Sequence, residues 1–223
     1  MGRPQGHGQG YEAKKQDIID TAAALFAKNG YASTGTTELG YATGLAKGAL
    51  YYYIKSKENL LVEIQDRVLG PLLENAATIR VLDLSAPARL RLISETLLDI
   101  IFARLDHIWV YEHDYRHLTG KNLKHFMARR HEFEMVIEGL IVEAMRDEYF
   151  EHVDPHLAML EFFNLHNHTY QWLKPGITRW SATELSQTYC RTLFRGLATS
   201  GFDTEAIEAE VAAFRGSQIS AKP

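Results

Sequence analysis

The stretch TTELGYATGLAKGALYYYIKSKENL, residues 36–60, determines how the first quarter of this chain folds. Its spacing predicts two short helices, over about 37–43 and 46–53, joined by a tight turn at Gly44. Glycine supplies the positive φ that such a turn requires. Three apolar side chains are spaced to pack both helices against a preceding one: Leu39, Leu45 and Leu50. The stretch therefore predicts a helix-turn-helix.

The second of these helices combines small side chains with phenolic and ammonium groups. Ala46, Gly48 and Ala49 are small enough to let the helix lie close to base edges in a DNA major groove, which is about 12 Å wide. Tyrosine hydroxyls and the Lys47 ammonium can reach phosphates and fix the register. Lys57 falls in the first turn of the next helix, where free backbone N–H groups also favour an anion. A second interpretation, in which Tyr51 is a core residue, stays open.

The same stretch resembles the TetR family of bacterial transcriptional regulators. The resemblance lies in the patterns Thr-x-x-Leu, Gly-Leu, Lys-Gly-x-Leu-Tyr-x-Tyr and Lys-Ser-Lys-Glu-x-Leu, and it covers residues 14–61. It implies a regulator that binds double-stranded DNA at a palindromic operator. It also implies DNA contacts for the residues at matching positions: Thr36, Thr37, Lys47, Gly48, Ala49, Tyr51, Tyr52, Tyr53 and Lys57.

Three positions depart from the family pattern. Ala46 stands where Ser or Thr usually caps the recognition helix, which removes a cap worth ~1 kcal/mol and a hydroxyl that could reach phosphate. Ile54 replaces the usual aromatic residue, and Gly40 stands where Ala is commoner. The fold tolerates all three, and Ala46 has no hydroxyl for the phosphate contact that the family pattern implies at this position.

The remainder of the chain also has helical periodicity, without alternating strand patterns or internal repeats. We expect an all-α fold, with an N-terminal three-helix helix-turn-helix DNA-binding domain and a C-terminal helical ligand-binding and dimerisation domain. The expected domain boundaries are a flexible arm (1–10), the DNA-binding domain (11–58), the sensing and dimerisation domain (59–215) and a tail (216–223). Further helices are expected over about 11–28, 57–79, 87–105, 108–118, 122–148, 155–172, 183–199 and 204–214.

Composition excludes several classes of protein. The chain has 223 residues, of which 46% are hydrophobic and 23% charged, as in ordinary globular proteins. No apolar run approaches the roughly 20 residues of a membrane span, and residues 1–10 do not resemble a secretory signal. The single cysteine, Cys190, excludes an intramolecular disulfide, so we expect a cytoplasmic protein. Residues 1–58 carry seven basic and five acidic side chains, and this mildly basic part suits an anionic partner.

The resemblance also implies a homodimer, because family members place two recognition helices about 34 Å apart, one turn of B-DNA. The family's dimer interface is a four-helix bundle from the last two long helices of each subunit, which correspond here to 155–172 and 183–199. Plausible interface residues are Leu157, Leu160, Glu161, Leu193, Phe194 and Leu197. The core of a monomer would use the same apolar stripe, so the sequence leaves both interpretations open.

Aromatic residues are dense between positions 88 and 172, where polar side chains are interspersed among them. Such a stripe is more often core than ligand pocket, but buried polar groups need partners, and a ligand is one candidate. The predicted ligand-binding residues are Phe102, Trp109, His113, Tyr115, Phe133, Phe163, His166, Asn167, Tyr170 and Lys174. His166, Tyr170 and Lys174 share one face if the helix extends that far. We expect no metal site, because hydrogen-bonded or exposed histidines explain the pattern better.

The segment TYQWLKPG, residues 169–176, resembles TetR regulators that sense acyl-CoA thioesters in lipid or steroid breakdown. That resemblance implies an amphipathic anionic effector, and a hydrophobic drug-like or aromatic effector is the alternative. No other cofactor is expected.

We therefore expect a ligand-controlled repressor rather than an enzyme. The effector would move the helix that begins at Lys57, with a hinge at the kink expected at Pro71. The chain lacks the G-x-S-x-G, H-E-x-x-H, P-loop and dinucleotide motifs, and Cys190 suits a buried structural thiol. A helical enzyme, or an adaptor without DNA binding, is the alternative.

Overall fold

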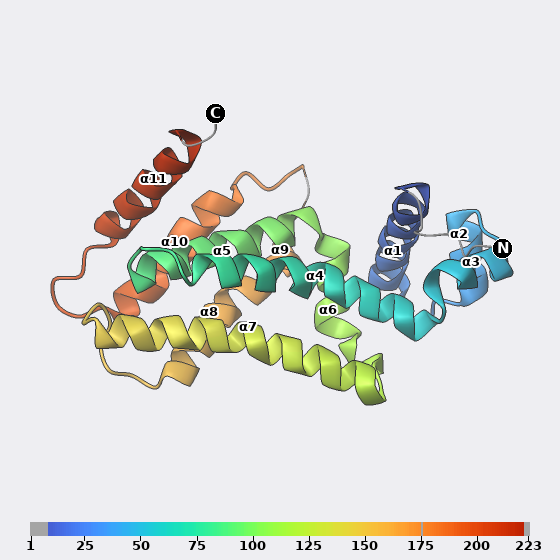
Figure 1. Ribbon diagram of the computed structural model, residues 1–223, viewed down its shortest axis with the longest axis horizontal. Coiled ribbons are helices and arrows are strands. Elements are labelled where there is room, and N and C mark those ends of the chain that lie inside the picture. The colour runs from blue at the N-terminus through green and yellow to red at the C-terminus, as the bar shows by residue number, and fades with distance from the viewer. Residues whose placement is uncertain (1–8, 175, 221–223) are drawn as a thin grey trace, which may run out of the picture. The chain divides into compact units, whose positions relative to one another are not determined.

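The computed structural model describes residues 9–174 and 176–220. Within these ranges the chain is helical (Figure 1), and an isolated antiparallel bridge between Phe150 and Ala198 is the only pairing of the β type. The prediction of an all-α fold is confirmed. Residues 1–8 of the expected arm and residues 221–223 of the expected tail lie outside the described residues.

The element order agrees closely with the periodicity of the sequence. Thr36–Thr43 and Lys47–Ile54 form the two helices of the helix-turn-helix, and Pro71 lies inside the long helix that follows. The helices are α1 (Gln9–Asn29), α2 (Thr36–Thr43), α3 (Lys47–Ile54), α4 (Lys57–Ile79), α5 (Ala86–Ala103), α6 (Leu105–His113), the 3₁₀ turn η1 (Tyr115–His117), α7 (Gly120–Arg146), α8 (Pro155–Asn167), α9 (Thr169–Trp172), α10 (Ala182–Leu197) and α11 (Thr204–Ser220).

Several helix ends differ from the prediction. Arg104 has φ −140° and ψ 46°, which is not helical, so the segment expected over 87–105 ends at Ala103 and a new helix begins directly after it. The helix expected over 155–172 is broken at His168. Helix α7 begins at Gly120, before the expected start at 122, and α11 continues past Phe214 to Ser220.

Packing divides the chain into two compact units. The first contains residues 1–69 and 104–128, and the second contains residues 70–103 and 129–223. Residues 104–128, from α6 to the first turns of α7, therefore pack with the helix-turn-helix although they lie far from it in sequence. The domain boundaries expected above refer to sequence segments and stay a prediction.

The core of the first unit unites α1, α2, α3 and α4. Leu39 and Leu50 are fully buried, and Leu45 packs against the same cluster, as their spacing predicted. Ile18 and Phe26 bring the inner face of α1 to this core. Residues of α6 and α7 complete it, with Val110 and Phe126 among them. The two short helices are therefore held on a rigid support.

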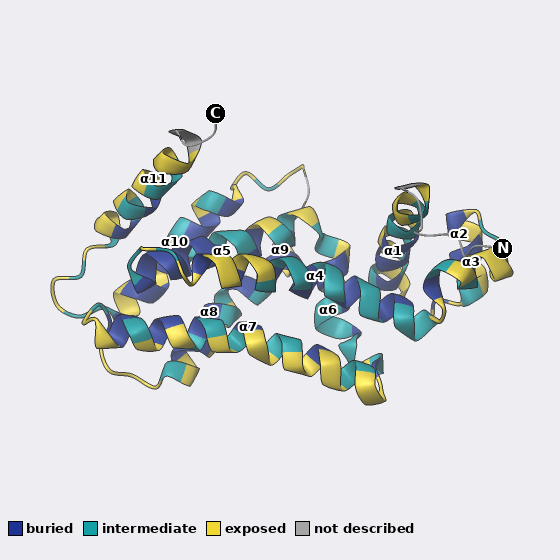
Figure 2. Ribbon diagram, viewed as in Figure 1, coloured by how far each residue is buried: buried dark blue, intermediate teal, exposed yellow. Residues whose placement is uncertain are grey.

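In the second unit α5 is the central helix. Figure 2 shows most of α5 in the colour of buried residues, and residues Ala86–Ser94 are buried without a break. Helices α8, α10 and α11 pack against it. Ser181 is the N-cap residue of α10 and forms a capping box with Glu184, in which the two side chains accept from one another's backbone N–H groups. Among the described residues, no helix is both long enough and apolar enough to cross a membrane.

Candidate nucleic-acid interface

The turn between α2 and α3 depends on two glycines. Gly44 has φ 68° and ψ 24°, the left-handed conformation predicted for it, and its N–H donates to the Tyr41 carbonyl at 3.2 Å. The Leu45 N–H donates to the Gly40 carbonyl at 2.8 Å. A Cβ on Gly40 would lie 2.8 Å from the Leu45 carbonyl oxygen, so the hydrogen atom of Gly40 lets the chain fold back closely.

Helix α3 begins without a side-chain cap. Ala46 is its N-cap residue, and no side chain bonds to the first N–H groups there, as the departure from the family pattern predicted. Lys47, Gly48 and Ala49 follow in the first turn and are exposed. The start of the helix therefore presents small side chains, one ammonium group and uncapped backbone donors to solvent.

The two sides of α3 differ sharply. Leu50 and Ile54 are buried in the core of the unit, whereas Tyr52 is 61% exposed. Tyr51 is half-buried but is not among the residues packed on the core, so the core interpretation is not favoured for it. On α2, Thr37 is exposed and Thr36 is half-buried. A polar and aromatic surface therefore covers the outside of the helix-turn-helix.

An aromatic cluster braces α3 against α1. The Tyr53 ring stacks on the Tyr11 ring at a centroid distance of 4.9 Å and an angle of 22°. Tyr52 meets the edge of Tyr11 at 5.6 Å and of Tyr53 at 5.3 Å. Tyr53 also packs on the hydrophobic core. The predicted DNA contacts Tyr52 and Tyr53 thus also help to fix the orientation of α3.

Lys57 is turned toward the protein. Its ammonium donates to the Tyr31 carbonyl and lies 4.1 Å from the centroid of the Tyr31 ring and 5.8 Å from that of Phe26. Burial lowers the pKa of Lys57, and the Asp114 carboxylate partly opposes this effect. The DNA contact predicted for Lys57 stays a prediction, and the structure uses its ammonium internally.

Residues of α4, η1 and α7 surround this lysine. The Tyr31 ring stacks on His117 at 5.1 Å. Glu58 accepts hydrogen bonds from the Thr119 N–H at 2.9 Å and from the Asn122 amide at 3.0 Å, which lowers the pKa of Glu58. The start of α4 is therefore fastened to the start of α7 within the first unit.

Two exposed side chains of the helix-turn-helix were not predicted. Tyr41 on α2 is 92% exposed. Lys55, directly after α3, is exposed and has a positive φ of 61°. The position of Lys55, between the end of one helix and the cap residue Ser56, indicates an exposed connecting residue. Spacing alone does not predict its positive φ.

His166, a predicted ligand-binding residue, is buried in the second unit with both ring nitrogens occupied. Its Nδ1 lies 2.6 Å from the Phe162 carbonyl oxygen, so the neutral ring carries its proton there. Its Nε2 accepts from the Ser94 hydroxyl at 2.7 Å. Burial lowers the pKa of His166 to about 4. The ring is therefore neutral and satisfied by the protein itself, and its ligand contact stays a prediction.

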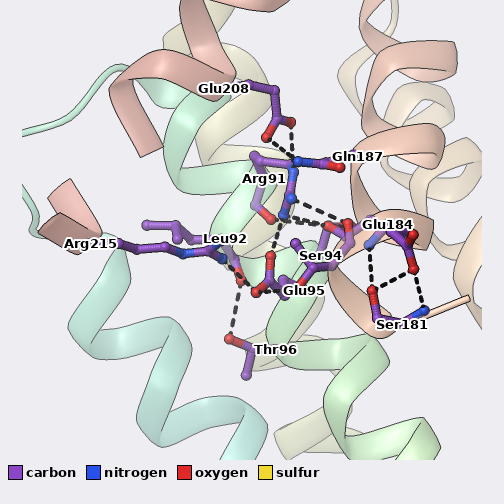
Figure 3. Close-up of polar contacts among 12 residues, drawn as sticks. Arg91, Leu92, Ser94, Glu95, Thr96, Ser181, Glu184, Gln187, Glu208 and Arg215 are labelled. Carbon is purple, nitrogen blue, oxygen red and sulfur yellow. Dashed lines mark hydrogen bonds and ion pairs between the residues drawn. The ribbon is translucent and has the colours of Figure 1, made fainter. Parts of the chain in front are cut away.

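The hydrogen bonds continue from Ser94 to a buried arginine. Ser186 donates to Ser94 at 2.7 Å and accepts from Arg91 at 2.8 Å. Arg91 is fully buried and pairs with Glu95 and Glu208, at 2.7 and 2.8 Å. Figure 3 shows Arg91 between these two carboxylates, with Arg215 pointing toward Glu95. This network joins α5, α10 and α11.

The other predicted ligand residues are divided between the units. In the first unit Trp109 stacks on His113 at 4.3 Å, and Tyr115 stacks on Phe126 at 5.5 Å. In the second unit Phe133 meets the edge of Phe163 at 5.6 Å. The remaining members of the set also lie in the second unit: Phe102, Asn167, Tyr170 and Lys174.

The face expected to join His166, Tyr170 and Lys174 does not form. The break at His168 interrupts the helix, and α9 ends at Trp172, so Lys174 lies beyond it. Tyr170 is buried, whereas Lys174 is exposed. The shared face was expected only if one helix continued to Lys174, and that condition is not met.

A groove of about 500 Å³ lies between α8 and α10. Its lining combines apolar and polar residues: Glu161, Asn164, Leu165, Thr192, Leu193 and Gly196. On the same helix α8, Leu157 is 59% and Leu160 43% exposed. Large apolar side chains of α8 are therefore open to solvent beside a groove.

Two family models match the chain. "Bacterial regulatory proteins, tetR family" matches residues 18–64, and "Tetracyclin repressor-like, C-terminal domain" matches residues 83–197. The HTH-type transcriptional repressor KstR2 of Rhodococcus jostii (strain RHA1) is 25% identical over 192 residues, which cover 85% of this chain and 94% of the relative.

Solved structures show the same fold. The TetR family regulator PfmR from Thermus thermophilus has a TM-score of 0.75 and 25% identity, covering 82% of this chain and 99% of that one. AibR in complex with isovaleryl coenzyme A and operator DNA has a TM-score of 0.72 and 23% identity, covering 81% and 98%. The helix-turn-helix and the helical remainder thus occur together in known regulators.

Proposed function

Since the chain belongs to the TetR family of bacterial regulators and is a ligand-responsive, DNA-binding repressor, we propose that it holds its operator through the outer surface of α3. The observation that supports this most directly is the contrast between the two sides of α3. Lys47, Gly48 and Ala49 are exposed and Tyr52 largely so, while Leu50 is buried. The small side chains allow close approach to base edges, and the ammonium and phenol contact phosphates.

The other predicted DNA-contacting residues have supporting roles in this proposal. Thr37 is exposed on α2, where its hydroxyl can reach a phosphate, and Thr36 lies beside it, half-buried. Tyr51 and Tyr53 are half-buried, and Tyr53 contributes mainly by bracing α3 against Tyr11. This division separates residues that read or touch DNA from residues that hold the reading helix.

The regulator acts as a homodimer in this proposal, on a palindromic operator. Exposed Leu157 and Leu160 of α8 and the groove between α8 and α10 supply the apolar surface that a symmetric partner would cover. A two-fold axis then places two copies of α3 about one DNA turn apart. A palindromic operator follows from that symmetry.

The effector we propose is a small hydrophobic or amphipathic molecule, with an acyl-CoA thioester as the leading class. AibR, which shares the fold, was solved with isovaleryl coenzyme A. The aromatic members of the predicted ligand set that lie in the second unit suit an acyl chain, and exposed Lys174 and Arg179 of the same unit suit a phosphate-bearing group. No further cofactor is required, and no catalytic step is assigned to the chain.

Effector binding would act on DNA binding through α4. Pro71 lies inside α4 and has no N–H to donate to the preceding turn, which weakens the helix locally. Lys57 and Glu58, at the start of α4, are fastened to Tyr31, Thr119 and Asn122. A shift of α4 would therefore move the segment between α1 and α2, where Tyr31 lies. The effector must bind the two states with different affinity for this to occur.

The DNA-reading role is tested with an operator selected by the full chain from a pool of random-sequence duplexes. We expect Tyr52→Phe and Lys47→Ala to bind this operator more weakly while keeping the thermal stability of the wild type. Lys124→Ala, on exposed α7 in the same unit, is the matched charge control and should bind as the wild type does. Unchanged affinity in both test variants would remove α3 from the interface.

The effector class is tested separately by native mass spectrometry and by thermal unfolding. We expect isovaleryl coenzyme A to raise the unfolding temperature and to release the selected operator, while free coenzyme A does neither. Stabilisation by a hydrophobic molecule without coenzyme A, and none by the thioester, would replace the proposed class with the drug-like alternative.

A further inference from the structure

The connection between α3 and α4 contains a strained residue with a long cationic side chain. Lys55 has φ 61° and ψ −52°, and the Ser56 N–H donates to the Ile54 carbonyl at 2.6 Å. These values describe a γ-turn of the rare form with positive φ, which non-glycine residues adopt only at an energetic cost. Such strain persists where the surroundings fix it, and it concentrates at functional sites.

Lys55 continues the outer surface of α3. It is the residue directly after α3 and follows the exposed Tyr52 by three positions in the sequence. Lys55 is exposed, whereas Ile54 beside it is buried. The turn therefore ends α3 with an exposed ammonium group, close in sequence to the exposed Tyr52.

The charges around Lys55 leave its ammonium available. In the described part of the chain, no hydrogen bond or ion pair holds the Lys55 side chain. Glu58, the next carboxylate along the chain, is occupied by Thr119 and Asn122. Lys57 is the opposite case, because its ammonium donates to the Tyr31 carbonyl and lies over the Tyr31 ring.

We propose that Lys55 makes a contact with the DNA backbone phosphate at the end of α3, and that Lys57 is a positioning residue that holds Tyr31. The inference deepens the proposed role of α3 and rests on it. A flexible ammonium suits a phosphate at the edge of the groove, since it binds as a point charge without reading sequence. The γ-turn leaves this lysine exposed between the end of α3 and the start of α4 at Lys57.

The test measures binding of the selected operator as a function of salt for Lys55→Gln, Lys57→Gln and the control Lys124→Gln. For Lys55→Gln we expect weaker binding to all duplexes and a slope of log affinity against log salt that is less steep by about one per subunit. For Lys57→Gln we expect a lower unfolding temperature with the wild-type slope. The control should match the wild type in both readouts.

Lys55→Gly supplies a second readout. Glycine accepts a positive φ without a Cβ penalty, so this variant should unfold at a higher temperature than the wild type while binding the operator as weakly as Lys55→Gln. Such a gain in stability with a loss of affinity is not expected of a merely structural lysine.

The outcomes separate this inference from the proposed function. If the wild type selects no duplex, the proposed function fails. If the wild type binds its operator and Lys55→Gln keeps both the affinity and the salt slope, this inference alone is overturned. A reduced slope for Lys57→Gln with unchanged stability would assign the phosphate contact to Lys57 instead.

Discussion

Gly44 and Lys55 have positive φ and lie before and after α3. Only one of these two conformations could be predicted from the sequence. Gly44 was predictable, because a glycine between two apolar helical stretches indicates a tight turn. Lys55 was not, because lysine has no preference for positive φ, and the turn that Lys55 forms lies between α3 and the start of α4 two residues later. Likewise, the inward turn of Lys57 depends on Tyr31, which lies 26 residues away in sequence.

Replacement of Gly44 by alanine should destabilise the folded chain. A Cβ in the left-handed region costs about 1 kcal/mol, and no neighbouring atom offers a compensating contact. Urea unfolding of the full chain measures this cost. The control is Gly48→Ala, which lies within α3 with open space around a Cβ and should be neutral or slightly stabilising. Equal effects of the two substitutions would contradict the turn geometry.

His166 should make stability depend on pH. Its pKa is about 4 in the folded state and ~6.5 when unfolded, so between these values the unfolded chain binds more protons. The stabilisation is complete above pH 6.5 and is lost as the pH falls toward 4, by about 2 kcal/mol at pH 5.

The measurement compares urea unfolding at pH 7 and pH 5 for the wild type and His166→Gln, at one protein concentration. Glutamine can still accept a hydrogen bond from Ser94 but does not titrate. We expect the loss between the two pH values to be smaller in the variant. An identical loss in both proteins would mean that His166 titrates normally in the folded state.

At the scale of elements, the periodicity of the sequence predicted most helices. It did not predict where some of them break or end, because contacts between distant residues contribute to those positions. The break at His168 has no glycine or proline to announce it, and neither has the break at Arg104. Helix α11 continues past Phe214 to a region that includes Arg215, whose partner Glu95 lies on α5. Spacing within one segment carries no information about such a partner.

Helix α11 lies outside the matched range of the C-terminal family model, yet it completes the ion network of Arg91. Glu208→Gln should therefore destabilise the chain by about 1–2 kcal/mol, because the buried guanidinium loses one of its two carboxylate partners and keeps Glu95. Glu205→Gln, exposed on the same helix, is the control and should change stability little. Thermal unfolding checks both, and equal stability of the two variants would show that Glu208 is dispensable to Arg91.

At the scale of the whole molecule, family and fold followed from the sequence, and the division into units did not. The helix-turn-helix motif identified the family, but nothing in its spacing showed that residues 104–128 pack with it. The ligand-binding residues were the hardest to predict, because aromatic side chains at helical spacing serve cores and pockets alike. His166 illustrates this, since its polar atoms are satisfied by Ser94 and Phe162.

The proposed dimer predicts the effect of charge on α8. Leu157→Glu combined with Leu160→Glu should convert a dimer into a monomer, because two carboxylates would be buried without partners at the interface. Sedimentation velocity of the full chain measures this directly. Val81→Glu, at a position 72% exposed in the wild type, is the control and should stay dimeric. A wild type that sediments as a monomer would refute the proposed assembly.

The most direct test of the central claim is the sequence of the duplex that the wild-type chain selects from a random pool. We predict an inverted repeat whose half-site centres lie one helical turn apart, about 10 base pairs, because two copies of α3 related by a two-fold axis read it. A pool that shows no enrichment, or enrichment of a single site without symmetry, would contradict reading of DNA by paired α3 helices.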